Sequence, residues 1–384
     1  MNESKCLRET PLSQWHRAHD GRMVEFAGYS MPVQYKTGVL AEHAAVREKV
    51  GIFDITHMGE IMVEGGGAEQ WLEGLVTNKI LGIAPGKVVY TAMCQDDGGV
   101  LDDMLIYRLA KHRWLVVCNA ANHDKILTWF QIHQPGKDVV IDDASYRTAL
   151  IAIQGPNSHQ LITRLEAIRP HTDSVGQLDF YTSLNVVVGG AEWVVSRTGY
   201  TGEHGYEIYV PNDMALSLWQ ELITKGEEFG VVPVGLAARD TLRFEVCYCL
   251  YGHELSEDTT PLEAGIGWAV KFKKADYIGK EALQKQKAAG VPRLLIGLEV
   301  AGRTIARQSA QVMSQNQLLG QVTSGNYSPT LRRSLALALV ASGVPDRELQ
   351  VEVRGKVYPC HAVPIPFLSA RVKGDPRAER TLPA

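Results

Sequence analysis

A chain reversal followed at once by a strand with two adjacent carboxylates is the feature that most constrains this sequence. Residues 96–99 read Asp-Asp-Gly-Gly, which is typical of a tight turn because glycine accepts the positive φ that such turns demand. Strand side chains alternate, so Asp102 shares one face with Val100 and Met104, and Asp103 lies on the other. Neither face is polar, so we expect at least one carboxylate against an apolar surface, which marks a functional candidate. An aspartate that caps the turn is the alternative.

The length, composition and charge of the chain limit the class of protein to which it can belong. With 384 residues it is too long for one ordinary core, so we expect two or three domains. Apolar residues make up 45% and charged residues 21%, which is typical of a globular protein. A formal charge of −4 gives no electrostatic reason to expect nucleic acid or an anionic membrane as a partner.

Targeting and redox signals favour the cytoplasm. No apolar run approaches the ~20 residues that span a bilayer, and the first residues lack the apolar core of a signal peptide. The cysteines are scattered, which favours buried thiols in a reducing compartment: Cys6, Cys94, Cys118, Cys247, Cys249 and Cys360. We therefore expect a cytoplasmic protein without a metal site.

The first part of the chain reads as an α+β block. Periodicity and turn residues predict helices at 39–49, 68–75 and 123–133. They predict strands at 23–29, 51–58, 59–63, 88–94, 100–109, 114–119 and 138–142. Met31–Pro32 is expected to break the chain after the first of these strands.

The middle of the chain predicts a second α+β pattern. A continuous apolar strand at 148–153 is followed by a helix near Ser158, two strands, a glycine-rich loop, a strand at 207–210 and helices at 213–228 and 236–247. This order resembles a split ferredoxin-like unit. From about residue 293, short strands at regular spacing predict a small all-β domain.

The glycine-rich loop at 198–207 is a candidate ligand contact, because glycine lets backbone approach a ligand closely. It has neither the dinucleotide spacing nor the Lys-Ser/Thr of a phosphate loop. Glu207 opens an apolar strand, so its carboxylate can face inward and pair with a planar N–C–N donor such as arginine or a pterin edge. A surface turn followed by an ordinary glutamate is the alternative.

Two arginines, Arg239 and Arg243, lie one turn apart on one helix face. A guanidinium on an otherwise apolar face must find an anion or a carbonyl. We expect one of them to form a salt bridge with a nearby acid: Asp240, Glu245 or Glu254. His57 has no second ligand nearby, so we expect a hydrogen-bonded core histidine rather than a metal ligand.

Short motifs along nearly the whole chain match one family in order. They lie at 10–12, 23–28, 31–35, 53–60, 98–103, 199–203, 238–243, 250–255, 260–265, 322–325 and 328–330. By these motifs the chain resembles the glycine cleavage system T-protein family, the folate-dependent aminomethyltransferases. Each motif is weak by itself, and the complete set in family order carries the resemblance.

The resemblance implies an α+β fold built as a three-domain cloverleaf around a central hole. Two domains would be α+β domains of ferredoxin-like type, and the third a small C-terminal β-barrel or jelly-roll domain. The first would be discontinuous, comprising 1–56 and 149–270, and the inserted domain 57–148 would carry the catalytic strand. The C-terminal β-rich domain would comprise 271–384.

The resemblance also implies a reaction. Lipoylated H-protein would deliver an aminomethyl group, ammonia would leave, and the methylene carbon would pass to tetrahydrofolate as acceptor substrate. Asp102 matches the catalytic carboxylate near the reactive folate nitrogens, where fixed negative charge stabilises a positive carbon. Glu207 matches the carboxylate that grips the pterin edge. Further matches to the folate pocket are Arg239, Tyr200, Tyr90, Asn119 and Met58.

The chain departs from the family pattern in places. Lys79 stands where the family typically has aspartate, and residues 246–249 replace a Gly/Leu/Pro-type run. Two other functions use this scaffold: a folate-dependent demethylase of a small N-, O- or S-methyl compound, and a non-enzymatic folate-binding iron–sulfur assembly factor. Motifs outside the folate pocket argue against the first, and the absence of the assembly factors' cysteine at 275–282 argues against the second.

Overall fold

The computed structural model describes residues 7–134, 136–343 and 349–372, and it divides into two compact units. The first unit comprises Met1–Ala68, Ile83–Val88 and Ile106–Asp240, and the second comprises Glu69–Gly82, Val89–Leu105 and Thr241–Ala384. The chain therefore passes between the units several times. The domain boundaries expected at 56/57, 148/149 and 270/271 stay predictions.

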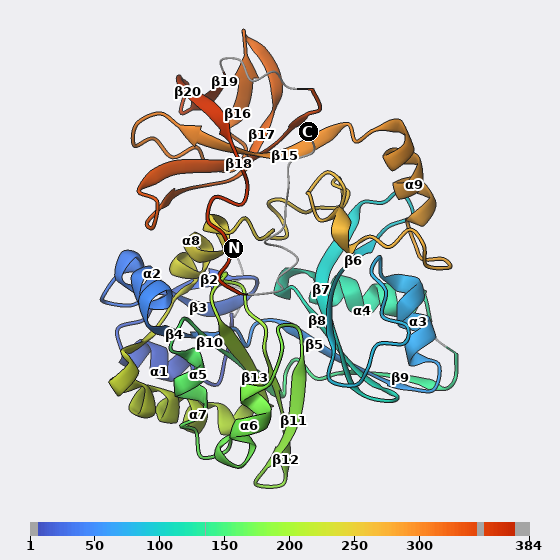
Figure 1. Ribbon diagram of the computed structural model, residues 1–384, viewed down its shortest axis with the longest axis vertical. Helices are drawn as coiled ribbons and strands as arrows, with labels where there is room; N and C mark the ends of the chain where they lie inside the picture. The colour runs from blue at the N-terminus through green and yellow to red at the C-terminus, as the bar shows by residue number, and fades with distance from the viewer. Residues whose placement is uncertain (1–6, 135, 344–348, 373–384) are drawn as a thin grey trace, which may run out of the picture. The chain divides into compact units, whose positions relative to one another are not determined.

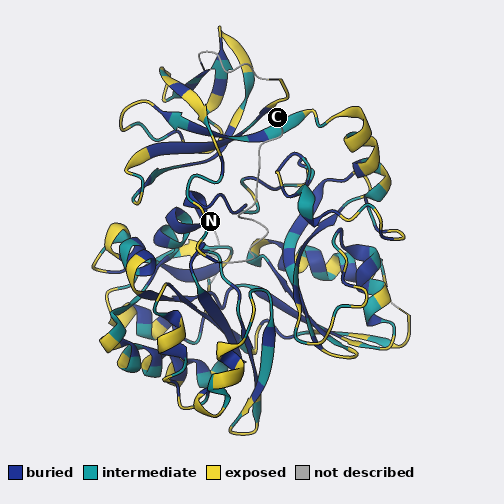
Figure 2. Cartoon of the chain, viewed as in Figure 1, coloured by how far each residue is buried: buried dark blue, intermediate teal, exposed yellow. Residues whose placement is uncertain are grey.

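A six-stranded sheet forms the core of the first unit. Its order is β11-β12-β13-β10-β4-β14, with β4 Val50–Asp54, β10 Thr148–Gln154, β11 Ser183–Val188, β12 Ala191–Ser196, β13 Gly205–Pro211 and β14 Val231–Pro233. The apolar run predicted at 148–153 is the central strand β10, antiparallel to both β4 and β13. Figure 2 shows these central strands in the dark blue of buried residues. A strand covered on both faces needs such a continuous apolar sequence.

Helices cover this sheet (Figure 1). They are α1 Ser13–Ala18, α5 Ser158–Ile162, α6 Thr172–Gly176 and α7 Asn212–Gly226. Leu161 from α5 and Trp219 from α7 are both 0% exposed and belong to the same core cluster as Ile151 of β10. The predicted helices near Ser158 and over 213–228 are therefore confirmed, and their apolar stripes build the core.

The N-terminal residues form a small sheet of order β1-β3-β2, from β1 Arg8–Glu9, β2 Arg22–Phe26 and β3 Tyr29–Gln34, followed by helix α2 Val39–Glu48. The break expected at Met31–Pro32 is wrong, because β3 runs through both residues. Strand β1 pairs with β3 only at Tyr29 and Ser30, and the ladder to β2 shifts register beside Pro32. The proline therefore lies where the ladder is already irregular, a position that tolerates its missing N–H.

A five-stranded sheet takes the order β6-β7-β8-β5-β9, and the division between the two units falls within β7. Its strands are β5 Gly59–Gly65, β6 Val88–Cys94, β7 Val100–Ala110, β8 Arg113–Cys118 and β9 Val139–Asp143. The accompanying helices are α3 Ala68–Leu75, η1 Ala120–Asn122 and α4 His123–Ile132. The predicted meander of 88–94, 100–109 and 114–119 is confirmed. Other short elements are η2 Arg169–His171, η3 Glu227–Phe229, α8 Leu236–Glu245 and η4 Gly267–Ala269.

The C-terminal part of the second unit is a closed barrel, drawn in orange to red in Figure 1. Its strands are β15 Arg293–Val300, β16 Gln311–Ser314, β17 Gln317–Ser328, β18 Arg333–Ala341, β19 Leu349–Val353 and β20 Lys356–Val363. Buried aliphatic side chains, among them Leu298, Ala336 and Val351, fill its interior. The small all-β domain predicted from about residue 293 is confirmed. Helix α9, Lys280–Ala289, precedes the barrel and was missed by the sequence reasoning.

The cysteines that the structure describes are buried and form no disulfide with one another: Cys94, Cys118, Cys247, Cys249 and Cys360. The expectation of buried thiols is confirmed for these five, and Cys6 lies outside the described residues. None of the helices in the described part of the chain combines the length and the apolar character that a membrane crossing requires.

Candidate active site

The turn before β7 is built as its glycines predict. Gly98 has a φ of +90°, and the Gln95 N–H donates to the Gly99 carbonyl over 2.8 Å to close the turn. A Cβ at Gly99 would lie 1.9 Å from the carbonyl oxygen of Glu257, so only glycine fits there. This close approach fixes the start of β7, the strand that carries the two predicted carboxylates.

Asp102 is 0% exposed in β7, and its strand neighbours on the same face, Val100 and Met104, are 0% and 2% exposed. The sequence prediction of a carboxylate against an apolar surface is therefore confirmed. Asp103 points to the other face and is only half-buried. A carboxylate fixed in apolar surroundings exerts a stronger field on a nearby positive charge than one in water.

Tyr90 lies in β6 and is 9% exposed. Its hydroxyl donates to Oδ2 of Asp103 over 2.9 Å, and its ring stacks on Trp268 with centroids 5.3 Å apart and planes at 26°. The structure therefore joins Tyr90 to the neighbour of Asp102 and gives it an aromatic partner. A pair of this kind presents a flat apolar surface beside a carboxylate.

Glu207 lies in β13 and is 8% exposed, which agrees with the expected inward-facing carboxylate. The Thr198 hydroxyl donates to its Oε2 atom, and the hydroxyls of Thr198 and Ser196 lie 2.7 Å apart. The Tyr107 hydroxyl is 3.4 Å from that of Ser196 and 2.8 Å from that of Tyr209. Burial raises the pKa of Tyr107, and the charge of Glu207 raises it further. Glu207 is thus held at one end of a cluster of neutral hydroxyls.

The glycine-rich loop at 198–207 packs against the side chain of Gln154. Gln154, at the end of β10, donates from Nε2 to the Thr198 carbonyl over 3.2 Å and accepts at Oε1 from the Thr201 hydroxyl over 2.9 Å. A Cβ at Gly199 would lie 2.1 Å from Oε1 of Gln154, and one at Gly205 would lie 2.3 Å from its Nε2. A side chain at either glycine would therefore displace the Gln154 amide from the hydrogen bonds that hold the loop.

Arg239 of α8 lies over the ring of Tyr200, with its guanidinium carbon 4.5 Å from the centroid. This is a cation–π contact between two of the predicted pocket residues. His57 is buried nearby, and burial, reinforced by the positive charge of Arg239, lowers its pKa to about 3. Its Nδ1 atom has no hydrogen-bond partner among the described residues, so the expected hydrogen bond of a core histidine is missing at this atom.

The remaining predicted residues occupy turns in the first unit. Met58 is half-buried, and its N–H donates to the Ile55 carbonyl over 3.1 Å in the turn between β4 and β5. Asn119 is half-buried directly after β8 and accepts from the Asn122 N–H over 2.9 Å. Of the predicted set, the structure brings together Tyr200 and Arg239 in the first unit, and it places Asp102 and Tyr90 on β7 and β6 in the second.

The second arginine of α8 forms the expected salt bridge. Arg243 is 1% exposed, and its Nη1 lies 2.9 Å from Oε2 of Glu254. It also donates to the Ser324 hydroxyl over 2.8 Å. The prediction that one of the two arginines pairs with a nearby acid is confirmed, and Arg243 is the structural one.

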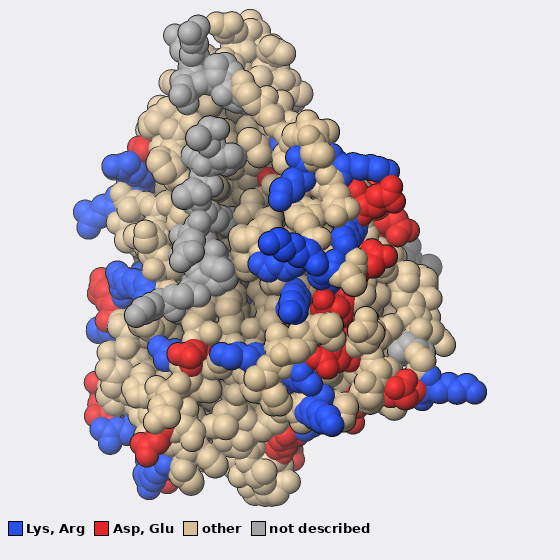
Figure 3. Space-filling model, turned by 45° about the vertical axis from the view of Figure 1, so that its right-hand side comes forward, with Lys and Arg blue, Asp and Glu red and all other residues tan. Residues whose placement is uncertain are grey.

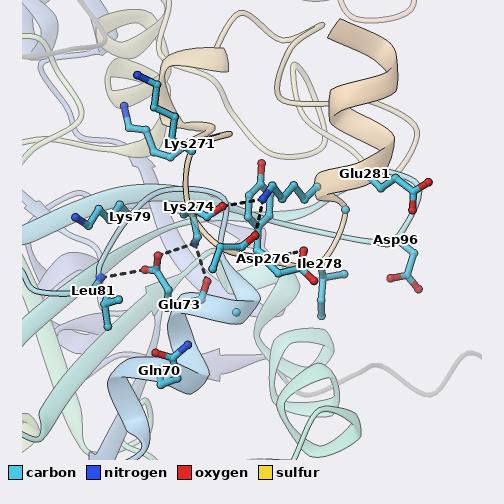
Figure 4. A pocket seen from close by; sticks show the side chains of 16 residues that line it. Gln70, Glu73, Lys79, Leu81, Asp96, Lys271, Lys274, Asp276, Ile278 and Glu281 are labelled. Carbon is cyan, nitrogen blue, oxygen red and sulfur yellow. Dashed lines mark hydrogen bonds and ion pairs between the residues drawn. The ribbon is translucent and has the colours of Figure 1, made fainter. Parts of the chain in front are cut away.

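Sequence reasoning missed a buried lysine in a pocket of about 910 Å³ in the second unit (Figure 4). Lys274 Nζ donates to the carbonyls of Glu73, Val76 and Asn78 over 2.6, 2.6 and 3.0 Å. Burial lowers its pKa to about 8, although the charge of Glu73 acts in the opposite direction. Glu73 lies in the last turn of α3, and Val76 and Asn78 follow the helix, so Lys274 caps its C-terminal end. Lys274 and Glu73 are 201 residues apart in the sequence, so no local pattern could have revealed this contact.

The rim of this pocket mixes charges of both signs. Lys79, Lys271 and Lys273 are exposed, and Asp96, Asp276 and Glu281 line the same pocket. The space-filling view likewise shows blue cationic groups beside red acidic ones (Figure 3). This pocket therefore has no strong net preference for an anion, and Lys79 contributes only one charge of several.

Two family models match the chain. The GCVT N-terminal domain matches residues 12–274, and the glycine cleavage T-protein C-terminal barrel domain matches residues 293–368. The second match lies over the closed barrel described above. Together the matches cover most of the described residues.

Individual relatives match over nearly their whole length. An aminomethyltransferase from Halothermothrix orenii is 42% identical over 364 residues, which are 94% of this chain and 100% of the relative. One from Caldanaerobacter subterraneus subsp. tengcongensis is 43% identical over 358 residues, 93% and 94% of the two chains. The crystal structure of glycine cleavage system aminomethyltransferase T from Bartonella henselae has a TM-score of 0.87 at 31% identity, over 96% of this chain and 99% of that chain.

The fold and the matches define a class of transferase in which an α+β N-terminal region precedes a closed β-barrel. The chain belongs to the glycine cleavage T-protein family. The family, the α+β fold with its C-terminal barrel, and the aminomethyltransferase class predicted from the motifs are thereby confirmed.

Proposed function

We propose that this protein transfers the methylene carbon of an aminomethyl group from lipoylated H-protein to tetrahydrofolate, with release of ammonia. The observation that carries the proposal is the buried carboxylate of Asp102. It is 0% exposed on an apolar strand face, in a chain 42% identical to an aminomethyltransferase over 94% of its length. The proposed compartment is the cytoplasm, which the scattered cysteines favour.

Asp102 has the central role in this proposal. When the carbon loses its bond to nitrogen and ammonia leaves, it becomes positive, and a fixed carboxylate stabilises that charge. The same carboxylate orients the reactive folate amine or accepts its proton. Burial strengthens both effects, because water does not screen the charge.

The other residues are assigned to holding the folate. Glu207 accepts hydrogen bonds from the N–C–N edge of the pterin, and the Thr198 hydroxyl fixes its orientation. The Arg239–Tyr200 pair offers a guanidinium and an aromatic face to the same substrate. Tyr90, Asn119 and Met58 are assigned to further contacts with the folate. A planar ring rich in N–H groups fits this combination of a buried carboxylate and aromatic surfaces.

The direct test is reconstitution. The purified protein is incubated with tetrahydrofolate and aminomethylated H-protein, and methylene-tetrahydrofolate and ammonia are quantified together. Equal amounts of both products are expected. A methyl product from a small N-, O- or S-methyl compound would support the demethylase instead, and folate binding without turnover would support a non-enzymatic role.

A further inference from the structure

A second cavity, of about 600 Å³ and open to solvent, lies in the first unit. Strands β5, β8, β12 and β13 supply its walls through Met62, Leu115, Val194 and Tyr209. Most of this lining is apolar. None of the residues assigned above to the transfer reaction lines this cavity.

Among the charged residues that line the cavity, Glu60 is the buried one. It lies in β5 between Gly59 and Ile61 and is 0% exposed. Its backbone is satisfied, because its N–H donates to the Ser145 hydroxyl over 2.9 Å and its carbonyl accepts from the Ala144 N–H over 2.9 Å. Its two carboxyl oxygens, by contrast, have no hydrogen-bond partner among the described residues.

An unpartnered buried carboxyl is costly, since it has lost its hydration and gained nothing in return. Burial raises the pKa of Glu60 well above its usual range, and the charge of Asp143 raises it further. A donor that entered the cavity would remove this cost. A buried polar group without a partner requires an explanation, and an apolar cavity with a few polar groups is the usual form of a small-molecule site.

The cations at the rim are already paired. Arg113 donates to Oε1 of Glu64 over 3.0 Å and also pairs with Glu192. Arg147 pairs with Asp142. Their charges are therefore balanced locally, and a partner for Glu60 has to bring its own charge and its own N–H groups.

We propose that this cavity is a binding site for a primary alkylamine. The neutral amine accepts the proton of the Glu60 carboxyl, the resulting ammonium group pairs with the carboxylate, and the alkyl chain packs against Met62, Leu115 and Val194. Because Glu60 is 0% exposed, its side chain changes rotamer to reach the ammonium group. A charge-assisted hydrogen bond in apolar surroundings is the type of contact that repays such a movement.

The test measures binding of n-hexylamine to the full-length protein by isothermal titration calorimetry, with 1-hexanol and hexanoate at the same concentrations. One amine per protein is expected, with affinity at least tenfold above that of hexanol. Glu60→Gln removes the charge with little change of shape and should weaken amine binding at least tenfold. Glu64→Gln is the matched control, because it removes a carboxylate from the exposed part of the same strand and should bind the amine as the wild type does.

A second variant guards against misfolding of the first. Met62→Trp fills the cavity from a half-buried position and should abolish amine binding while Glu60 stays in place. Equal affinity for hexylamine and hexanol would overturn the proposal. So would unchanged amine binding in a folded Glu60→Gln or Met62→Trp variant, or the absence of binding to the wild type at millimolar amine.

Discussion

The Tyr90 hydroxyl donates a 2.9 Å hydrogen bond to Asp103, the residue that follows Asp102 in β7. This contact distinguishes two carboxylates that are adjacent in sequence. Asp103 is half-buried and anchored by a phenol, and Asp102 is 0% exposed on the apolar face. Alternation along one strand thus assigns an anchoring role to one aspartate and leaves the other as the candidate for the transfer.

Replacing Asp102 with alanine tests that assignment. Asp102→Ala should keep the fold and most of the folate affinity, because the side chain it removes is small. Turnover should fall by at least about 100-fold, since the positive carbon loses its stabilising charge. Turnover is measured with aminomethylated H-protein, affinity by folate titration, and folding by thermal unfolding. Asp103→Asn is the matched control and should lose less than tenfold; wild-type turnover in Asp102→Ala would remove Asp102 from the mechanism.

Replacing Glu207 should affect binding rather than chemistry. Glu207→Ala removes the acceptor proposed for the pterin edge, so folate affinity should weaken by roughly 2–4 kcal/mol. Thr198→Val removes only the hydroxyl that orients Glu207, and a smaller loss of about 1 kcal/mol is expected. Fluorescence titration with tetrahydrofolate measures both. An alanine variant that binds folate as tightly as the wild type would contradict the role given to Glu207.

Local patterns predicted the elements well. Helix α3 at Ala68–Leu75 and strand β6 at Val88–Cys94 have the predicted bounds, because turn residues flank both segments and their apolar periodicity is clear. Pro32 led to the wrong prediction of a break in the chain. A proline can lie in β3 only where no neighbouring strand needs its N–H, and this depends on how far β1 extends along β3. Such pairing information is tertiary, and no window of sequence contains it.

The sequence predicted residues of the site only where the alternation of strand side chains or the family motifs included them. Alternation pointed to at least one of Asp102 and Asp103, because both faces of their strand are apolar in sequence, and the family resemblance singled out Asp102. Glu60 escaped notice, because its lack of a partner depends on which side chains of β8 and β13 face it across the cavity. The glycines of the 198–207 loop were linked to a ligand, whereas two of them, Gly199 and Gly205, pack against the side chain of Gln154 from β10.

Lys274 should stabilise the fold strongly although it has no part in the proposed reaction. Lys274→Met leaves three carbonyls at the C-terminal end of α3 without their donor and Glu73 without its cation, so unfolding free energy should fall by about 3 kcal/mol. Lys273→Met, at the exposed neighbouring position, should change it by less than about 0.5 kcal/mol. Urea unfolding measures both variants. Equal effects of the two substitutions would show that the helix cap contributes little.

His57 should make the protein sensitive to acid. Its pKa is lowered to about 3 in the folded protein, whereas an unfolded histidine titrates near its ordinary value of about 6.5. Between these values the unfolded chain binds the extra proton, so this residue's contribution to stability is complete above about pH 6.5 and is lost as the pH falls towards 3. His57→Gln removes this linkage, and below pH 6 its stability relative to the wild type should rise by at most about 1.4 kcal/mol per pH unit. Urea unfolding at pH 8, 7, 6 and 5 measures the difference, with His112→Gln, at an exposed position, as the control that should follow the wild type. Parallel curves for His57→Gln and the wild type would mean that His57 takes up its proton as easily in the folded protein as in the unfolded chain.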